Sequence, residues 1–249
     1  MKKLLTILIL TVLILSQAPT AFAALKFNSA TTNRVNYGSG SYLDNIATGT
    51  VLVWYKPDTM TSPKIIVSKH DDVSTGWNFN KFAATTIFRI NIRTSGTTWT
   101  ADSISTVMAT SSWNFMGATW EASSNASNPI VYWGSLLQIA RNVTASSVTG
   151  TGTFDNDSAL NMFVGNNTAA TTGSASGSIA WVGIWRRRLS LGEIRDQQFH
   201  PHPTEGNVLF THLGFNGVTS VPDWSGKRNT GTVTGATTSP HVPIKIFGR

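Results

Sequence analysis

The chain has 249 residues, no cysteine and a formal net charge of +7, and only 12% of its residues are charged. The absence of cysteine excludes disulfides and a lipid attached to cysteine, so a hydrophobic core alone must stabilise the fold. The low charge and the abundance of Ser, Thr, Asn and Gly favour strands joined by polar loops over helices.

The N-terminal segment, residues 1–23, has the pattern of an export signal. Two lysines open it, an uncharged apolar run follows from Leu4 to Leu15, and Ala21-Phe22-Ala23 is a small-x-small cleavage signal. We expect the mature chain to begin at Ala24 and to be secreted to the extracellular space or the cell surface. No later stretch is long and apolar enough to span a membrane. The alternative interpretation is a retained N-terminal anchor.

The mature chain, residues 24–249, suits one large all-β domain, and its sequence reads as short strands separated by turn residues. Phe88, Ile90 and Ile92 alternate with polar residues, which predicts that they face the core. Pro57 ends the clearest central strand. The expected strands are 25–27, 34–37, 50–57, 64–69, 77–82, 87–93, 113–121, 129–137, 160–165, 177–185 and 208–213.

The last long strand of this series continues into a short helix. Ala180, Val182 and Ile184 recur at a period of two, so we expect them on one face of the strand, with its tryptophans on the other face. Ser190 stands three residues before Glu193, which is the spacing of a capping box and predicts the start of a helix.

Three consecutive arginines, residues 186–188, lie between this strand and the helix. Such a triplet can bind an acidic glycan, a phosphate or a nucleic acid. No Gly-rich phosphate loop, zinc pattern or nucleic-acid motif accompanies it. We therefore interpret the arginines as a solvated corner, and we expect no nucleic-acid partner.

The closing strand and helix resemble those of the concanavalin A-like lectin/glucanase superfamily, in its laminin-G-like branch. The shared pattern is a Gly-x-Ile strand, an aromatic residue and then Leu-Ser-x-x-Glu-Ile, which this chain has between Gly177 and Ile194. Further resemblances are Trp-x-Lys-Pro at 54–57, the strand at 113–121, and Asp-x-Ser-Gly with Gly-Thr-x-x-Gly-Ala between 223 and 236. The resemblance implies a two-sheet antiparallel jelly-roll sandwich with one short helix near the C-terminal part. It does not choose a function, because this family includes sugar binders, protein binders, enzymes and structural modules.

Catalysis is not expected from the carboxylates. A glycosidase needs two of them roughly 5 to 9 Å apart, and the glucanases of this superfamily carry theirs on one strand as Glu-x-Asp-x-x-Glu. This chain has no such triplet: Glu121 is alone on its strand, and Glu193 is assigned to the helix cap. No Gly-x-Ser-x-Gly elbow supports nucleophilic catalysis either. We therefore interpret the chain as a non-enzyme.

Calcium is the cofactor that the loops could hold, because it prefers carboxylate, amide and backbone oxygens. The alternative is that Asp and Asn make turns there. No EF-hand spacing occurs. The candidate calcium ligands are Asp71, Asp72, Asp155, Asp157 and Asp223.

Tryptophan faces and polar groups are the usual means of binding sugars. Of the nine tryptophans, those in the matched central strands, Trp113 among them, are expected in the core. The other candidates lie at a strand start, in a polar loop and beside a hairpin tip where this chain has Trp-Gly in place of the family's Asp-Gly. The expected exposed, ligand-binding tryptophans are therefore Trp77, Trp99 and Trp133. Four sequons could carry glycans in a host with the machinery, at Asn125, Asn142, Asn156 and Asn166.

Three functions follow from these observations, in decreasing order of support. The first is a secreted, non-catalytic jelly-roll module that binds a glycan at a rim, with calcium as a candidate cofactor. The second is a structural subunit of an extracellular surface layer or filament, which assembles with neighbouring copies through sheet edges or rims. The third is a glycoside hydrolase.

Overall fold

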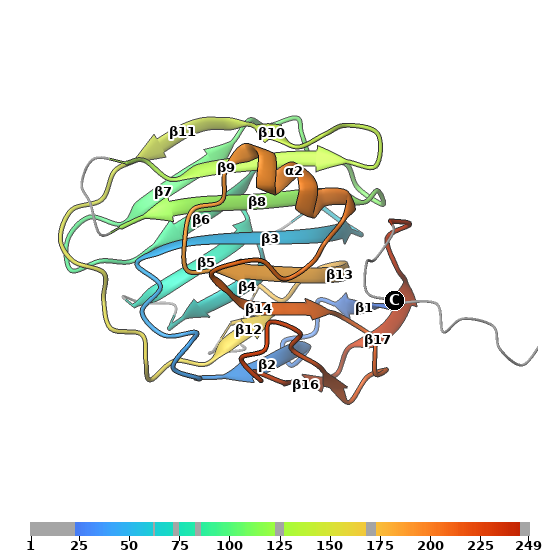
Figure 1. Ribbon diagram of the computed structural model, residues 1–249. Helices are drawn as coiled ribbons and strands as arrows, with labels where there is room; N and C mark the ends of the chain where they lie inside the picture. Colours follow the sequence, from blue (N-terminus) through green and yellow to red (C-terminus); the bar gives the residue numbers. More distant parts are fainter. Residues whose placement is uncertain are drawn as a thin grey trace, which may run out of the picture.

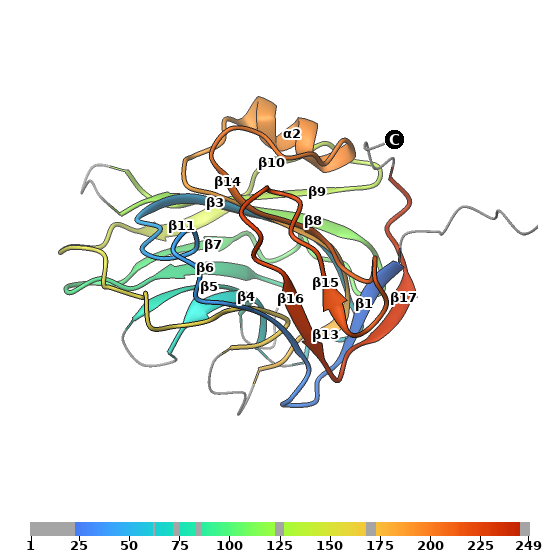
Figure 2. The same ribbon diagram turned by 60° about the horizontal axis from the view of Figure 1, so that its bottom comes forward.

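The computed structural model describes residues 23–61, 63–71, 75–82, 86–122, 127–167 and 173–244. These residues form two antiparallel sheets stacked face to face, with one helix, α2 (Leu191–Phe199), outside them (Figures 1 and 2). Sheet A contains β1 (Ala23–Asn28), β3 (Thr48–Pro57), β8 (Asn114–Glu121), β9 (Ile130–Ser135), β10 (Arg141–Asn142), β13 (Ser176–Trp185), β14 (Asn207–His212) and β17 (Thr237–Pro240). Sheet B contains β2 (Arg34–Gly38), β4 (Lys64–His70), β5 (Gly76–Lys81), β6 (Phe88–Ile92), β7 (Trp99–Ser103), β11 (Thr144–Val148), β12 (Met162–Val164), β15 (Ser220–Val221) and β16 (Gly231–Thr234).

The strand order confirms the predicted jelly-roll sandwich. Sheet A runs β10-β9-β8-β3-β13-β1-β17, and β14 pairs with the C-terminal half of β13 while β1 pairs with its N-terminal half. Sheet B runs β11-β7-β6-β5-β4-β12-β2-β16-β15. The expected export signal lies outside the described residues except for Ala23, which pairs with Pro240 at the edge of sheet A.

The core lies between the sheets, and strand alternation fills it. Phe88, Ile90 and Ile92 of β6 are fully buried in this core, as predicted. Arg89 and Asn91 are partly exposed on the opposite face, because neighbouring side chains of a strand point to opposite sides of a sheet.

A second apolar cluster covers the outer face of sheet A. Trp54 and Trp181 are fully buried in it, under Ile194 of α2 and Val242 of the C-terminal segment. The Nε1 of Trp54 donates a hydrogen bond to the carbonyl oxygen of Gln198 at 2.9 Å. The central strands β3 and β13 of sheet A are therefore buried on both faces, and this contact fixes α2 against β3.

The helix begins where the sequence predicts. Ser190 is the N-cap: its Oγ accepts a hydrogen bond from the Glu193 backbone N–H at 3.3 Å, and its own N–H donates to Glu193 Oε2 at 2.8 Å. Arg187 donates to the other carboxylate oxygen of Glu193 and holds the pKa of that carboxyl at about 2. The Nη1 of Arg188 lies 3.7 Å from Glu121 Oε2. None of the helices that the structure describes has the length and hydropathy of a membrane span.

The structure corrects the predicted face of one β13 residue. Val182 and Ile184 face the core, as predicted, but Ala180 lies with Trp181 in the outer cluster. The cause is an irregularity in the pairing with β3 between Ile179 and Val182, where a β-bulge places two successive side chains on the same face.

The structure also corrects the predicted hairpin after β8. Trp133 and Gly134 lie inside β9, paired with Met116 and Phe115, rather than at a tip. The turn comes after Ser135, whose backbone N–H donates a hydrogen bond to the carbonyl oxygen of Gln138 at 2.9 Å. Because Met116 faces the core, its partner Trp133 faces the core as well.

Candidate functional site

The best candidate for a binding site is a groove of about 580 Å³ at one rim of the sandwich, which we call the rim groove. The loop between β7 and β8 forms one wall, and the end of β9 with the turn that follows it forms the other. The rim groove is lined by Val107, Ala109, Ser111, Ser112, Trp113, Asn114, Trp133, Ser135, Leu136 and Leu137.

Asn114 positions the first wall. Its side chain is buried, and its Oδ1 accepts hydrogen bonds from the Ala109 backbone N–H and from Trp133 Nε1, each at 3.1 Å. Its Nδ2 donates to the carbonyl oxygens of Ala109 at 3.0 Å and Ser112 at 2.8 Å. The amide therefore holds the loop against β8 and β9. Its oxygen and nitrogen already make two hydrogen bonds each, so neither is available to a ligand.

The turn that forms the second wall is positioned by α2. The Oε1 of Gln198 accepts from the Ala140 backbone N–H at 2.6 Å, and its Nε2 donates to the carbonyl oxygens of Ser135 and Gln138 at 2.7 and 2.8 Å. Gln198 is fully buried. A Cβ at Gly134 would lie 2.7 Å from this Nε2, so the close approach requires glycine.

Two indoles lie in the rim groove. Trp133 forms its floor, with 8% of its surface exposed. Trp113, which precedes β8, is partly exposed and packs against the outer cluster of sheet A. Ser111 and Ser112 of the exposed loop also line the rim groove and carry hydroxyl groups. None of the described residues that line the rim groove is charged.

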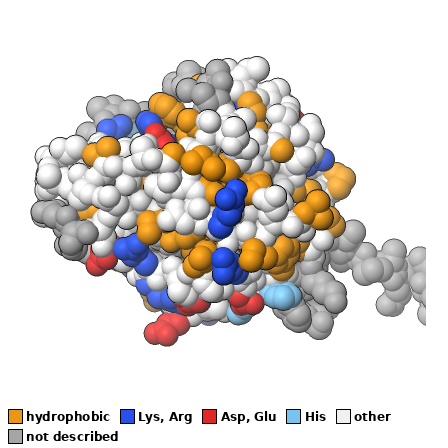
Figure 3. Space-filling model, turned by 90° about the horizontal axis from the view of Figure 1, so that it is seen from above, with side chains coloured by type: hydrophobic (Ala, Val, Ile, Leu, Met, Phe, Trp, Pro, Cys, Tyr) orange, Lys and Arg blue, Asp and Glu red, His pale blue; other side chains and the backbone are white. Residues whose placement is uncertain are grey.

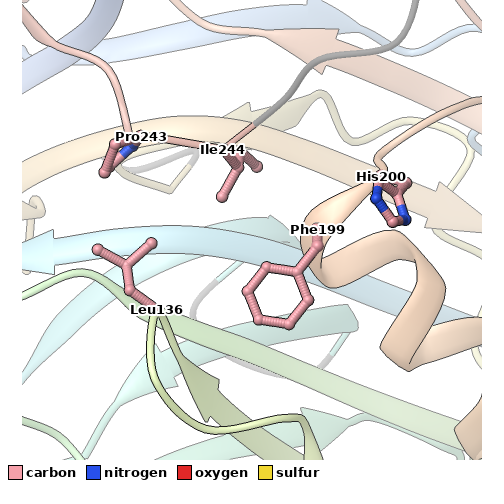
Figure 4. Close-up of a pocket in the computed structure, with 5 residues that line it drawn as sticks. All are labelled: Leu136, Phe199, His200, Pro243 and Ile244. Atoms are coloured by element: carbon pink, nitrogen blue, oxygen red, sulfur yellow. The ribbon is translucent and has the colours of Figure 1, made fainter.

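A second, smaller hollow of about 340 Å³ shares Leu136 with the rim groove (Figure 4). Its other lining residues are Phe199 and His200 at the end of α2, and Pro243 and Ile244 of the C-terminal segment. In the close-up, Phe199 and Leu136 project from opposite sides of this hollow. None of these five described residues has a hydroxyl or amide side chain, so the rim groove is the stronger candidate for binding a polar ligand.

Apolar side chains also gather on the outer surface at this end of the sandwich. Figure 3 shows them around basic groups on the face seen from above, which carries β10, β11 and α2 in Figure 1. Leu137 is 95% exposed and Ile139 is 58% exposed, both in the turn after β9.

The expectation of exposed tryptophans is wrong at all three positions. Trp77 is fully buried and packs on Trp120 with ring centroids 5.1 Å apart. Trp99 is fully buried as well, because it begins β7 rather than lying in a loop. Trp133 faces the core and reaches the surface only as the floor of the rim groove. Trp113, expected in the core, lines the rim groove instead.

The candidate calcium ligands do not converge on one site. Asp223 closes a turn: its Oδ1 accepts from the N–H groups of Phe210 and Ser225, and its Oδ2 from that of Asn229. Asp71 accepts from the Thr75 N–H at 2.9 Å in the β4–β5 connection. Within the described part of the chain, no three His, Asp or Glu side chains are grouped as a metal site.

The other two candidate calcium ligands that the structure describes, Asp155 and Asp157, differ in their surroundings. Asp155 is partly exposed. Asp157 is fully buried, and burial raises the pKa of its carboxyl to about 6. Its neighbour is Lys69, whose Nζ lies 3.9 Å from Asp157 Oδ1. Asp72 lies outside the described residues.

Two of the sequons are accessible and one is not. Asn142 and Asn156 are exposed. Asn166 is buried, and its Nδ2, the atom that would carry a glycan, donates to Thr31 O at 2.5 Å and Ser174 Oγ at 2.8 Å. The prediction of glycosylation is therefore wrong at Asn166 in the folded chain. Asn125 lies outside the described residues.

Comparison with known proteins supports the fold. Neither a scan of protein-family models nor a search of curated proteins found a match. Among solved structures, a candidate carbohydrate-binding protein from Bacteroides ovatus superposes with a TM-score of 0.62 at 13% identity. The alignment covers 90% of this chain but only 62% of that one, so this chain spans less than two thirds of its length.

Two further structures are similar at lower scores. The CBM40 domain of the Ruminococcus gnavus IT-sialidase, bound to alpha2,3 sialyllactose, has a TM-score of 0.47 at 12% identity over 69% of this chain and 94% of that one. Domains LG4-5 of the mouse laminin alpha1 chain have a TM-score of 0.45 at 11% identity over 66% of this chain and 41% of that one. The superposition on the Bacteroides ovatus structure supports the two-sheet jelly-roll fold that the strand order shows.

Proposed function

We propose that this chain is a non-catalytic module that binds a neutral carbohydrate in the rim groove. The observation that carries the proposal is the lining: a partly exposed indole, a second indole that is nearly buried, and two serines of the loop. A pyranose ring has an apolar face that stacks on an indole and a rim of hydroxyls that hydrogen-bond to serines. The volume of about 580 Å³ lies within the usual range of small-ligand sites.

The charge of the lining favours a neutral sugar over an acidic one. The ten lining residues that the structure describes are uncharged. A carboxylate or sulfate group of a ligand would lose hydration on entering the rim groove and would find no cation there to compensate. A neutral hexose carries no such cost.

The arrangement of carboxylates supports binding without catalysis. Glu121 faces Arg188 and Glu193 is held by Arg187 and the helix cap, so both are engaged in structural contacts. Asp157 is fully buried, away from any ligand that approaches from solvent. None of these carboxylates lines the rim groove. The expected export signal places the chain outside the cell, where glycans are available as ligands.

A glycan array followed by calorimetric titration tests the proposal. We expect binding to one or more neutral oligosaccharides and none to sialylated or sulfated versions of the same core. In Trp113→Ala, the lost apolar contact of about 1.5 kcal/mol or more weakens binding by about tenfold. Trp224→Ala is the matched control, because it removes a partly buried indole that is outside the lining. Loss of binding in the control alone, or no binding to any sugar, would contradict the proposal.

One observation favours a second candidate function, assembly with neighbouring copies. The turn after β9 presents Leu137 at 95% exposure and Ile139 at 58%, and exposed apolar groups of this kind can mark a protein interface. Sedimentation velocity over a range of concentrations tests it. Assembly that disappears in Leu137→Ser would support it, and monomers at every concentration would exclude it.

A further inference from the structure

The ammonium group of Lys69 lies inside a cage of oxygen atoms. Lys69 belongs to β4, and its side chain is fully buried. Its Nζ lies 2.9 Å from Asp44 Oδ1, 3.4 Å from Ser39 Oγ and 3.9 Å from Asp157 Oδ1, and it donates to the carbonyl oxygen of Leu160. The cage is assembled from two loops, residues 39–45 after β2 and residues 157–160 before β12.

The two loops also bind each other around this group. The backbone N–H of Asn45 donates to Asp157 Oδ1 at 2.7 Å, and Asn45 Oδ1 accepts from the Asp157 backbone N–H at 3.0 Å. Ser39 Oγ donates to Asp44 Oδ1 at 3.1 Å and also contacts the carbonyl oxygen of Ser158. Both loops therefore converge on the position of Nζ.

The oxygens are of the kind that bind a metal ion. Two carboxylates, a hydroxyl and a backbone carbonyl are typical calcium ligands. Asp157 Oδ2 is buried and has no hydrogen-bond partner among the described residues. These oxygens could bind a cation, and the cation that they surround is the ammonium group of Lys69.

The charge balance leaves no room for a divalent ion beside Lys69. Asp44 and Asp157 carry two negative charges when ionised. Lys69 supplies one positive charge, and Arg186 supplies another by donating to the carbonyl oxygens of Tyr42 and Asp44. A calcium ion added to this balanced set would lie close to a buried ammonium, and the repulsion between like charges in a poorly solvated site would expel it.

We propose that Lys69 Nζ occupies the position that a bound calcium ion could otherwise take between these two loops. The loops that follow β2 and precede β12 are held together by a built-in ammonium, so their assembly needs no metal. Asp157, which the sequence predicts as a calcium ligand, then belongs to a cation site whose cation is covalently part of the chain. The same oxygens become a metal site when the lysine is shortened.

Thermal unfolding with and without metal tests the proposal. In the wild-type chain, neither millimolar Ca²⁺ nor a chelator is expected to move the unfolding midpoint. In Lys69→Ala, the buried carboxylates lose their partner and the midpoint falls by about 10 °C. Millimolar Ca²⁺ restores part of that loss, because it binds the folded form only. The control Lys26→Ala removes a partly exposed ion pair with Asp58 and shows a small loss that Ca²⁺ does not restore.

Further variants separate the possible outcomes. Lys69→Ala/Asp157→Asn retains the shortened side chain but removes one carboxylate, and we expect Ca²⁺ to restore less of its stability. If Lys69→Ala does not fold without metal, refolding it with and without Ca²⁺ gives the same comparison. A wild-type midpoint that falls with chelator, or a Lys69→Ala variant that Ca²⁺ does not stabilise, overturns the proposal. Because this site lies outside the rim groove, these results do not depend on sugar binding.

Discussion

Replacing Asn114 by Ala removes the amide that ties the wall of the rim groove to the sheet. Four hydrogen bonds are lost, two accepted by Oδ1 and two donated by Nδ2. At about 1 kcal/mol net each, they would total about 4 kcal/mol. Ala109 and Ser112 are exposed and can bond to water instead, whereas Trp133 Nε1 is left buried without a partner. We therefore expect a loss of about 3 kcal/mol in the free energy of unfolding.

Urea denaturation of wild type and variant measures this loss directly, as a shift of the midpoint at constant slope. Asn142→Ala is the matched control: Asn142 is exposed and its side chain accepts one hydrogen bond, from the Thr144 N–H. We expect less than about 0.5 kcal/mol from the control. A loosened wall also weakens sugar binding in Asn114→Ala while leaving Asn142→Ala unchanged. If Asn114→Ala is as stable as the control, the role given to this amide is refuted.

Three further predictions follow from buried or strained positions. Gly177 has φ +140°, and an added Cβ would lie 2.2 Å from the Lys56 carbonyl oxygen. We therefore expect Gly177→Ala to lower the free energy of unfolding by about 2 kcal/mol or more. Gly192→Ala in the first turn of α2 meets nothing closer than 3.8 Å and should not destabilise in the same urea assay. Burial raises the pKa of Asp157 from 3.8 to about 6. Above pH 6, the ionised carboxylate therefore lowers the free energy of unfolding by up to about 3 kcal/mol. This cost is relieved as the pH falls through 6 towards 4, so the stability of Asp157→Asn relative to wild type should be greatest at pH 7 and decline on acidification; a constant difference would contradict it. The pKa of Glu193, lowered to about 2 chiefly by its hydrogen bond from Arg187, means that this partly exposed carboxylate contributes stability above pH 4.5 that is lost as the pH falls through 2. Glu193→Gln should therefore cost about 0.5–1 kcal/mol at pH 7 and almost nothing at pH 2 by thermal unfolding, and an equal cost at both values would refute the role of the charge.

Strand alternation and capping chemistry account for the parts of the fold that the sequence predicts. The apolar period of two placed Phe88, Ile90 and Ile92 in the core, and the Ser190–Glu193 spacing located the start of α2. Both signals are local, since each depends on residues a few positions apart. β7 was not predicted because its residues after Trp99 alternate only Ala and Ser with polar residues, and this weak pattern resembles a loop.

The candidate sites could not be predicted in the same way, because they depend on contacts between distant segments. Trp113 and Trp133 share a groove through the pairing of β8 with β9 and through the amide of Asn114. Lys69 meets Asp157 across 88 positions of sequence, with no motif that links them. The bulge in β13 that turns Ala180 outward likewise has no signal in its own residues.

Sugar binding in the rim groove is measured by calorimetric titration of the wild-type chain and Trp113→Ala with a neutral oligosaccharide selected on a glycan array. We expect the oligosaccharide to bind saturably to the wild-type chain and about tenfold more weakly to Trp113→Ala. A chelator should change neither affinity. Equal affinity of the two proteins, or selection of only sialylated or sulfated glycans by the array, would contradict a neutral-sugar site at this rim.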